Sequence, residues 1–259
     1  MINPAGSLGP IRRPMRTSSQ SLRDCADQAC AQGAFCDVFI KLGGSILDQD
    51  TATAALVPRI TELARKHRIL ILTGGGLAAK RIKTNQRSER TDFYRCWRAG
   101  VLCLEVNAHL LASYSTHFAI VSSLTEMAVC FASGNIGVFA PLGAIVNSLY
   151  LVPDWEATTD SIGLHFASAL GAQRYIIVSD VDGIYEKRPG EKPIGVPIPH
   201  LSVDDLERLP SSKLDPAFSA YFRRQALPTI IVNGQHPDRV GAAIRGESTL
   251  GTRIDTFKE

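Results

Sequence analysis

The sequence predicts an α/β protein built on a largely parallel sheet. Residues 37–76 spell strand, glycine turn, helix, strand and second glycine turn, the order of a parallel sheet with right-handed crossovers. A further buried strand that ends in a glycine turn lies at 175–185. The chain has 259 residues, 45% of them hydrophobic, which is enough for a substantial core in one domain or two closely packed lobes.

The first 34 residues predict a mobile extension before a domain at 35–259. They are rich in Ser, Arg, Gly, Pro and Gln and lack an apolar period. An organelle transit peptide is the alternative, although Asp24 and Asp27 interrupt it. No apolar run reaches the roughly 20 residues of a membrane helix, and the start lacks the apolar core of a secretory signal. We therefore expect a cytoplasmic protein that does not bind membranes, with reduced cysteines and no metal site.

The predicted strands are short apolar runs bounded by glycine, proline or polar residues. In chain order they span 37–42, 68–73, 118–121, 136–139, 175–178, 229–232 and, as an edge strand, 251–254. The predicted helices lie between them and span 51–67, 91–113, 125–133, 162–170, a short helix capped by Ser202, 215–226 and 237–245. Gly246 is expected to stop the last helix. Residues 141–152 are left unassigned, and the four prolines and two glycines of 186–199 predict an irregular surface loop.

Two glycine turns, at 43–44 and 74–76, follow buried strands. Glycine lets backbone N–H groups approach phosphate oxygens because no Cβ blocks them and the next helix points its positive end at the anion. Each turn alone also fits an ordinary tight turn, and neither has P-loop spacing. Lys41 stands in an apolar strand just before the first turn, where an unpaired charge is costly to bury. We expect it to meet an anion such as a transferring phosphoryl group, with snorkelling to the strand end as the alternative.

Two acidic segments follow further along the chain, at 158–161 and 179–185. Asp160 precedes the helix predicted at 162–170, either as an acid that interacts with the helix dipole or as a carboxylate that holds lysines or magnesium near phosphates. Residues 179–185 turn out of a strand at its carboxyl end, where open α/β sheets bind ligands. They offer polar edges and an apolar wall for a purine, and an Asx turn at 182–183 is the plain alternative.

Four short motifs in one order resemble the amino acid kinase family: KLGGS at 41–45, TGGG at 73–76, TTDS at 158–161 and DVDGIY at 180–185. The resemblance implies a three-layer αβα sandwich with an acceptor-binding lobe at about 35–152 and a nucleotide-binding lobe at about 153–259. It also implies a homo-oligomer that transfers the γ-phosphoryl of ATP, with Mg²⁺, to a small anionic acceptor. The segments at 155–161, 232–239 and 245–254 are most similar to kinases of methanofuran biosynthesis, whose acceptor is an aminomethyl-furanmethanol phosphate. The last segment also resembles molybdenum storage proteins.

Carried over residue by residue, the resemblance implies a set of roles. Lys41 would stabilise the transferring phosphoryl group, Asp160 would organise the lysines, and Lys213 would be the second catalytic lysine. The predicted contacts with ATP are Gly43, Gly44, Ser45, Gly75, Ser179, Asp180, Asp182, Gly183, Tyr185, Lys187 and Pro189. The predicted contacts with the acceptor are Gly74, Gly76, Lys80, Arg81, Thr158 and Thr159.

Residues 80–90 hold a concentrated run of basic residues in a chain of net charge +3. This segment matches no family pattern and occupies the stretch where family members recognise the acceptor. We interpret it as a surface loop or a clamp for an acceptor that already carries a phosphate, rather than as a nucleic-acid site. A non-catalytic member of the fold, either a molybdenum or tungsten oxoanion store or a nucleotide sensor, is the second hypothesis. Lys41 and Asp160 favour the enzyme.

Overall fold

The computed structural model describes residues 35–86, 91–148, 151–186, 195–209 and 213–255. Eight strands form one sheet: β1 (Val38–Leu42), β2 (Ile69–Thr73), β3 (Phe118–Val121), β4 (Ile136–Phe139), β5 (Arg174–Ser179), β6 (His200–Ser202), β7 (Thr229–Asn233) and β8 (Thr252–Asp255). Their order is β3-β4-β2-β1-β5-β7-β8-β6. Every neighbouring pair is parallel except β7 and β8. The sheet runs through both predicted lobes.

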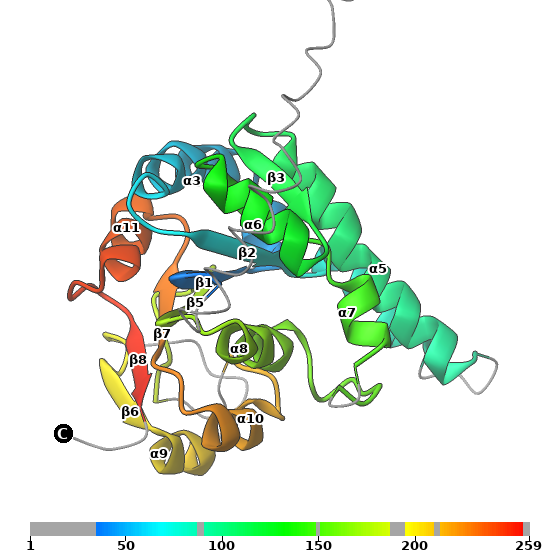
Figure 1. Cartoon of the computed structure of the whole chain (residues 1–259). Coiled ribbons are helices and arrows are strands. Elements are labelled where there is room, and N and C mark those ends of the chain that lie inside the picture. The colour runs from blue at the N-terminus through cyan, green and yellow to red at the C-terminus, as the bar shows by residue number, and fades with distance from the viewer. Residues whose placement is uncertain (1–34, 87–90, 149–150, 187–194, 210–212, 256–259) are drawn as a thin grey trace, which may run out of the picture.

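Helices cover both faces of the sheet, so the predicted three-layer αβα sandwich is confirmed (Figure 1). They are α2 (Gly44–Leu47), α3 (Asp50–Leu63), α4 (Gly76–Gln86), α5 (Phe93–Ala112), α6 (Leu124–Ala132), α7 (Leu142–Val146), α8 (Thr159–Ala169), α9 (Val203–Arg208), α10 (Phe218–Gln225) and α11 (Pro237–Arg245). None in the described part of the chain is long and apolar enough to cross a membrane.

The pleat of β1 sends its side chains to two different cores. Val38, Ile40 and Leu42 belong to the core that includes buried residues of α3 and α11. Phe39 belongs to the core that includes buried residues of α8 and α10. Because successive side chains of a strand alternate between faces, Lys41 shares the face of Phe39. The strand therefore delivers one lysine to the side of the sheet on which α8 packs.

Several predicted ends are confirmed by their local chemistry. The side chain of Ser202 accepts a hydrogen bond from the backbone N–H of Asp205 at 3.1 Å, which caps α9 as expected. Gly246, with φ +78°, ends α11. Pro58 lies inside α3, which begins at Asp50 and is shorter than the predicted helix.

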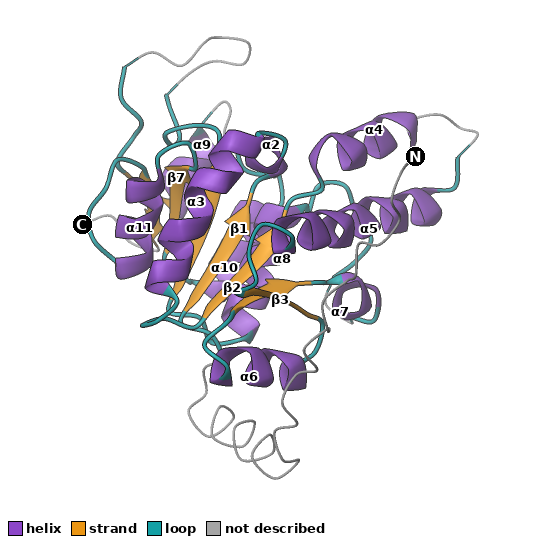
Figure 2. Cartoon of the chain, turned by 90° about the horizontal axis from the view of Figure 1, so that it is seen from above, coloured by secondary structure: helices purple, strands orange, loops and turns teal. Residues whose placement is uncertain are grey.

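The structure corrects four other predictions. The basic segment is helix α4 up to Gln86 rather than a loop, and it lies beside α5 (Figure 2). None of its residues is buried, so the sequence lacks the stripe of core-facing apolar residues by which a helix is predicted. The predicted edge strand β8 is interior, because the three-residue strand β6 pairs along its outer side. Helix α7 lies in the stretch 141–152, which the sequence analysis left unassigned. Helix α10 begins at Phe218 rather than at residue 215.

Tyr175 fixes the start of α8 to β5. Its side chain is fully buried, and its hydroxyl donates to the backbone carbonyl oxygens of Asp160 at 2.9 Å and Thr159 at 3.3 Å. Burial raises the pKa of the Tyr175 hydroxyl well above its ordinary value, which keeps it a donor. Gly163 makes room for the ring, because a Cβ at this position would collide with the tyrosine hydroxyl.

Gly163→Ala tests this packing. The added methyl group has to displace a ring that is fixed on all sides, so we expect a loss of about 1–3 kcal/mol in the free energy of unfolding, measured by urea denaturation. Gly143→Ala in α7 is the matched control, since its Cβ would meet nothing within 4 Å. Equal stability of the two variants would contradict the proposed contact.

Candidate active site

The two glycine turns lie against each other at the carboxyl ends of β1 and β2. The backbone N–H of Gly74 donates to the carbonyl of Leu42 at 2.7 Å, and that of Gly43 donates to the carbonyl of Val178 at 2.8 Å. A Cβ on Gly74 would sit 2.6 Å from the backbone nitrogen of Gly44, so a side chain is excluded by backbone on the other turn. Glycine is therefore required at these positions for the two turns and the start of α4 to pack against one another.

A buried ion pair stands beside these turns. Lys41 Nζ lies 2.7 Å from Asp160 Oδ1, and the two side chains are only 12% and 9% exposed. Asp160 lies in the first turn of α8, whereas the sequence analysis placed it just before the helix. Among the described residues, its Oδ1 atom has no hydrogen-bond donor besides the Lys41 ammonium. The pair therefore joins the middle of the sheet to the positive end of α8.

Asp215 is a second buried carboxylate, and the sequence analysis missed it by placing it inside a helix. It accepts hydrogen bonds from Thr158 N at 2.9 Å, Thr158 Oγ1 at 3.0 Å and Ser161 N at 3.0 Å, and from the Ser161 hydroxyl. Burial and the nearby charge of Asp160 raise its pKa. Asp215 thus satisfies free N–H groups at the start of α8 from 54 to 57 residues away.

The other predicted catalytic lysine lies at the end of β5. Lys213 Nζ is 3.8 Å from Asp180 Oδ1, with side chains 49% and 37% exposed. Ser179 donates its hydroxyl to the same carboxylate at 3.2 Å. The structure therefore brings Lys213, Asp180 and Ser179 together at the carboxyl edge of the sheet.

The turn after β5 is held by C-terminal residues. Asp182 accepts from Asn233 Nδ2 at 2.9 Å and from Arg239 Nη1 at 2.6 Å, and these two donors hold its pKa below the ordinary value. The Thr252 hydroxyl accepts the backbone N–H of Ile184 at 2.7 Å, close beside Gly183. Asp182 thus anchors the turn to β7 and α11. Tyr185 is half-buried after it, and Lys187 and Pro189 lie outside the described residues.

A pocket of about 240 Å³ opens between α4, α5 and the start of α8. Five residues predicted to contact ATP or the acceptor line it: Gly75, Gly76, Lys80, Thr158 and Thr159. The rest of its wall combines apolar, aromatic and charged side chains: Ala79, Lys83, Trp97, Gly100, Val101, Leu104, Asp154, Trp155, Ala157 and Ile162. Arg81, also predicted, is exposed and does not line the pocket, whereas its neighbour Lys83 does. The sequence analysis missed the two tryptophans and Asp154.

Trp155 is fixed in this wall from two directions. Lys83 Nζ donates to its backbone carbonyl at 2.7 Å and lies 5.9 Å from the centre of its ring. Gly100 of α5 also leaves space for the ring, because a Cβ there would lie 2.7 Å from it. A glycine inside a helix costs about 1 kcal/mol relative to alanine, so the space is maintained against the local preference of the chain.

Comparison with known proteins identifies the family. Residues 38–233, more than half of the chain, match the model of the amino acid kinase family. The chain belongs to the amino acid kinase family. It is accordingly a small-molecule kinase that uses ATP, and both the recognition and the fold predicted from the four motifs are confirmed.

Several individual kinases are similar to this chain over most of its length. A 5-(aminomethyl)furan-3-ylmethyl phosphate kinase of Methanocaldococcus jannaschii is 24% identical over 216 residues, which cover 83% of this chain and 96% of that protein. A uridylate kinase of Methanococcoides burtonii is 27% identical over 239 residues, 85% of this chain and 97% of that protein. The structure of uridylate kinase from Archaeoglobus fulgidus superimposes with a TM-score of 0.67 at 23% identity, covering 84% and 99% of the two chains. The resemblance to molybdenum storage proteins stays a prediction.

Metal-binding side chains do not cluster in the described part of this kinase. No group of three or more His, Cys, Asp or Glu there could hold a metal ion by itself. The described cysteines are Cys36, Cys96, Cys103 and Cys130, all free thiols, and burial raises the pKa of Cys36 to about 12. Cys25 and Cys30 lie outside the described residues.

Asp215→Ala tests the link between the segment before α10 and the start of α8. The substitution leaves buried donors of Thr158 and Ser161 without an acceptor, so we expect a loss of about 2–4 kcal/mol in the free energy of unfolding, measured by urea denaturation. Asp204→Ala is the control, because Asp204 is 60% exposed and its pairing with Arg223 contributes little. A variant at position 215 as stable as the control would refute the link.

Proposed function

We propose that this kinase transfers the γ-phosphoryl group of ATP to the phosphate of a small ring-bearing metabolite that also carries an amine. The observation that carries the proposal is the buried Lys41–Asp160 ion pair, whose Asp160 directly follows Thr158 and Thr159 in the wall of a pocket with basic, aromatic and acidic residues. The names of the related kinases support a phosphorylated acceptor, since each includes a phosphate compound. The predicted lobes and the homo-oligomer remain part of the proposal.

Sheet order supplies the geometry of transfer. Strand β1 lies between β2, whose turn leads into α4 and the pocket, and β5, whose turn carries the predicted nucleotide contacts. Lys41 on β1 is thus between the two sides. Phosphoryl transfer needs mainly positioning and stabilisation of charge on the transferred group, with attacking and leaving oxygens roughly in line. Lys41 would donate to that group, and Asp160 would hold the ammonium in place.

Charge around the ion pair fits a nucleotide that arrives with magnesium. Lys41 pairs with Asp160, and Asp215 is a second buried carboxylate whose pKa is raised by burial and by the nearby charge of Asp160. An added cation would relieve this excess of negative charge. Magnesium typically binds one or two carboxylates together with substrate phosphates, and when bound it would neutralise charge on the β- and γ-phosphates. Lys213, which pairs with Asp180 at the end of β5, would be the second lysine to contact the phosphates.

The pocket walls support each part of the proposed acceptor. Trp155 offers a fixed ring face for stacking, and Lys80 supplies a cation for a phosphate. Asp154 accepts the backbone N–H of Glu156 at 3.0 Å, and in the described part of the chain no basic side chain forms an ion pair with it. A carboxylate in this setting favours an acceptor with an ammonium group. The aminomethylfuran compound named for the M. jannaschii relative has a ring, an amine and a phosphate.

Uridylate is the second candidate acceptor, because the M. burtonii relative is a uridylate kinase. It has a ring and a phosphate but no ammonium group for Asp154. Purified protein should be incubated with ATP, Mg²⁺ and either compound, and the diphosphate product and ADP quantified by mass spectrometry. We expect the aminomethylfuran phosphate to be converted with the higher kcat/KM. Turnover of neither compound would argue against the proposed acceptor class, and ATP binding without any product would favour the non-catalytic alternative.

Lys41→Ala and Asp160→Asn test the catalytic roles. The first removes the ammonium that would stabilise the transferring phosphoryl group, and the second removes the charge that would hold this ammonium in place, so we expect kcat to fall by about 10²–10³-fold. The control is Lys66→Ala, because Lys66 is exposed after α3 and away from the glycine turns. Folding of each variant is checked by circular dichroism, since breaking a buried ion pair also costs stability. Unchanged turnover in both folded variants would exclude the assignment.

Asp154→Asn tests recognition of the amine. The neutral amide loses a charge-assisted hydrogen bond, so we expect KM for the aminomethyl compound to rise by about 10-fold, with KM for ATP unchanged. The analogue with a methyl group in place of the aminomethyl group should show no such rise. Asp204→Asn, on the exposed first turn of α9, serves as the control. Equal effects of the substitution on the two acceptors would contradict the pairing.

A further inference from the structure

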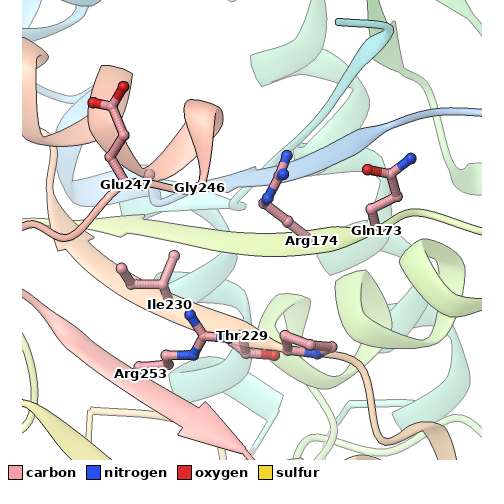
Figure 3. Close-up of a pocket in the computed structure, with 9 residues that line it drawn as sticks. Gln173, Arg174, Thr229, Ile230, Gly246, Glu247 and Arg253 are labelled. Atoms are coloured by element: carbon pink, nitrogen blue, oxygen red, sulfur yellow. The ribbon is translucent and has the colours of Figure 1, made fainter.

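A second pocket, of about 210 Å³, lies at the amino ends of β5 and β7, at the opposite edge of the sheet from the kinase site. It is lined by Gln173, Arg174, Pro228, Thr229, Ile230, Ala243, Gly246, Glu247 and Arg253. Figure 3 shows its two arginine side chains on separate strands, with Thr229 and Ile230 of the intervening strand between them. None of these residues takes part in the proposed phosphoryl transfer.

Strand register places both arginines on one face of the sheet. Ile230 pairs with Arg253, so their side chains share a face. Tyr175 pairs with Thr229, and alternation therefore puts Arg174 on the face of Ile230. This is the face on which α11 packs, and the pocket opens where α11 ends at Gly246. The chain has thus left a half-open hollow with an apolar floor and two guanidinium groups at its sides.

Arg174 is the cation in this hollow whose charge is not neutralised by a neighbour. Its Nη1 donates to the carbonyl of Ile244 at 3.2 Å, and its side chain lies against Gly246, where a Cβ would be 2.8 Å from Nε. In the described part of the chain no carboxylate forms an ion pair with it. A half-buried guanidinium with a planar fork of donors is suited to a carboxylate or phosphate.

The neighbouring charges are already paired. Glu247 accepts two hydrogen bonds of 2.7 Å each from Arg245, so it is not available for a cationic ligand. Arg253 donates its Nε to Asp255 at 2.8 Å, and its side chain is 58% exposed, so it can turn toward an anion at the pocket. The charges in and around the pocket therefore sum to an excess of one positive charge, which favours an anion over a cation.

We propose that this pocket binds a small oxyanion with a short apolar body, either a phosphate monoester or a carboxylate. The oxyanion would meet Arg174 and Arg253, and the apolar body would cover Pro228, Ile230 and Ala243. The site is separate from the kinase pocket, because Arg174 is the first residue of β5 and the predicted nucleotide contacts after this strand begin at its last residue, Ser179. A ligand bound there would stand at the other end of the same strand.

Phenyl phosphate, inorganic phosphate and benzoate are the probes. Each is titrated into the full chain while the side-chain Nε–Hε signals of Arg174 and Arg253 are followed by NMR, with both signals assigned from the substitutions below. This readout separates the proposed pocket from anion binding at the kinase site. We expect saturable shifts of both signals with phenyl phosphate or benzoate, and weaker binding of inorganic phosphate, which lacks the apolar body.

Three substitutions complete the test. Arg253→Gln removes an exposed charge without disturbing α11 and should weaken phenyl phosphate binding, followed at Arg174, by about 10-fold. Arg174→Gln should abolish the shift of the Arg253 signal. Arg208→Gln, 78% exposed on α9, is the matched control and should bind as the wild type does. The proposal is overturned if Arg174 shows no shift up to about 10 mM probe, a range that covers millimolar affinities, or if Arg253→Gln binds as tightly as the control.

Discussion

The buried ion pair between Lys41 and Asp160 is the constraint on which the rest of the site depends. A lysine in the middle of a sheet is tolerated only with a partner of opposite charge, and β1 offers no acidic residue of its own. The partner comes from the first turn of α8, so that turn must be held accurately. Tyr175 holds it from the sheet and Asp215 holds it from the segment before α10. Three separate parts of the chain thus fix one ammonium group.

In this arrangement the proposed acceptor pocket lies on the β2 side of β1, and the predicted nucleotide contacts of the turn after β5 lie on its other side. Glycine at the ends of β1 and β2 leaves no side chain between the two turns, so the start of α4 at Gly76 can pack against Gly44. Helix α4 in turn rests on α5 and presents Lys80 and Lys83 to the pocket. Two lysines of the basic segment therefore line the pocket that we propose as the acceptor site, in a chain whose charge is otherwise balanced.

Local patterns in the sequence predict the strands, the glycine turns and the sandwich, because each is encoded within a few residues. Long-range contacts are not encoded in this way. Asp215 follows the pattern of a helix start with a nearby proline, yet its partners are 54 to 57 residues away. Helix α4 has no buried residue, so hydrophobic periodicity cannot reveal it. The pocket tryptophans look like core residues, and only the open space between α4, α5 and α8 shows that they line a site.

The most direct test of the central claim is a crystal structure with a non-hydrolysable ATP analogue and Mg²⁺. The account predicts that the γ-phosphoryl group lies within hydrogen-bonding distance of Lys41 Nζ, roughly 2.7–3.2 Å, with the base beside the turn that follows β5. It also predicts that the pocket between α4 and α5 stays open to an acceptor on the other side of that group. A nucleotide bound elsewhere, with the phosphates away from Lys41 and the ion pair with Asp160 unchanged, would contradict it.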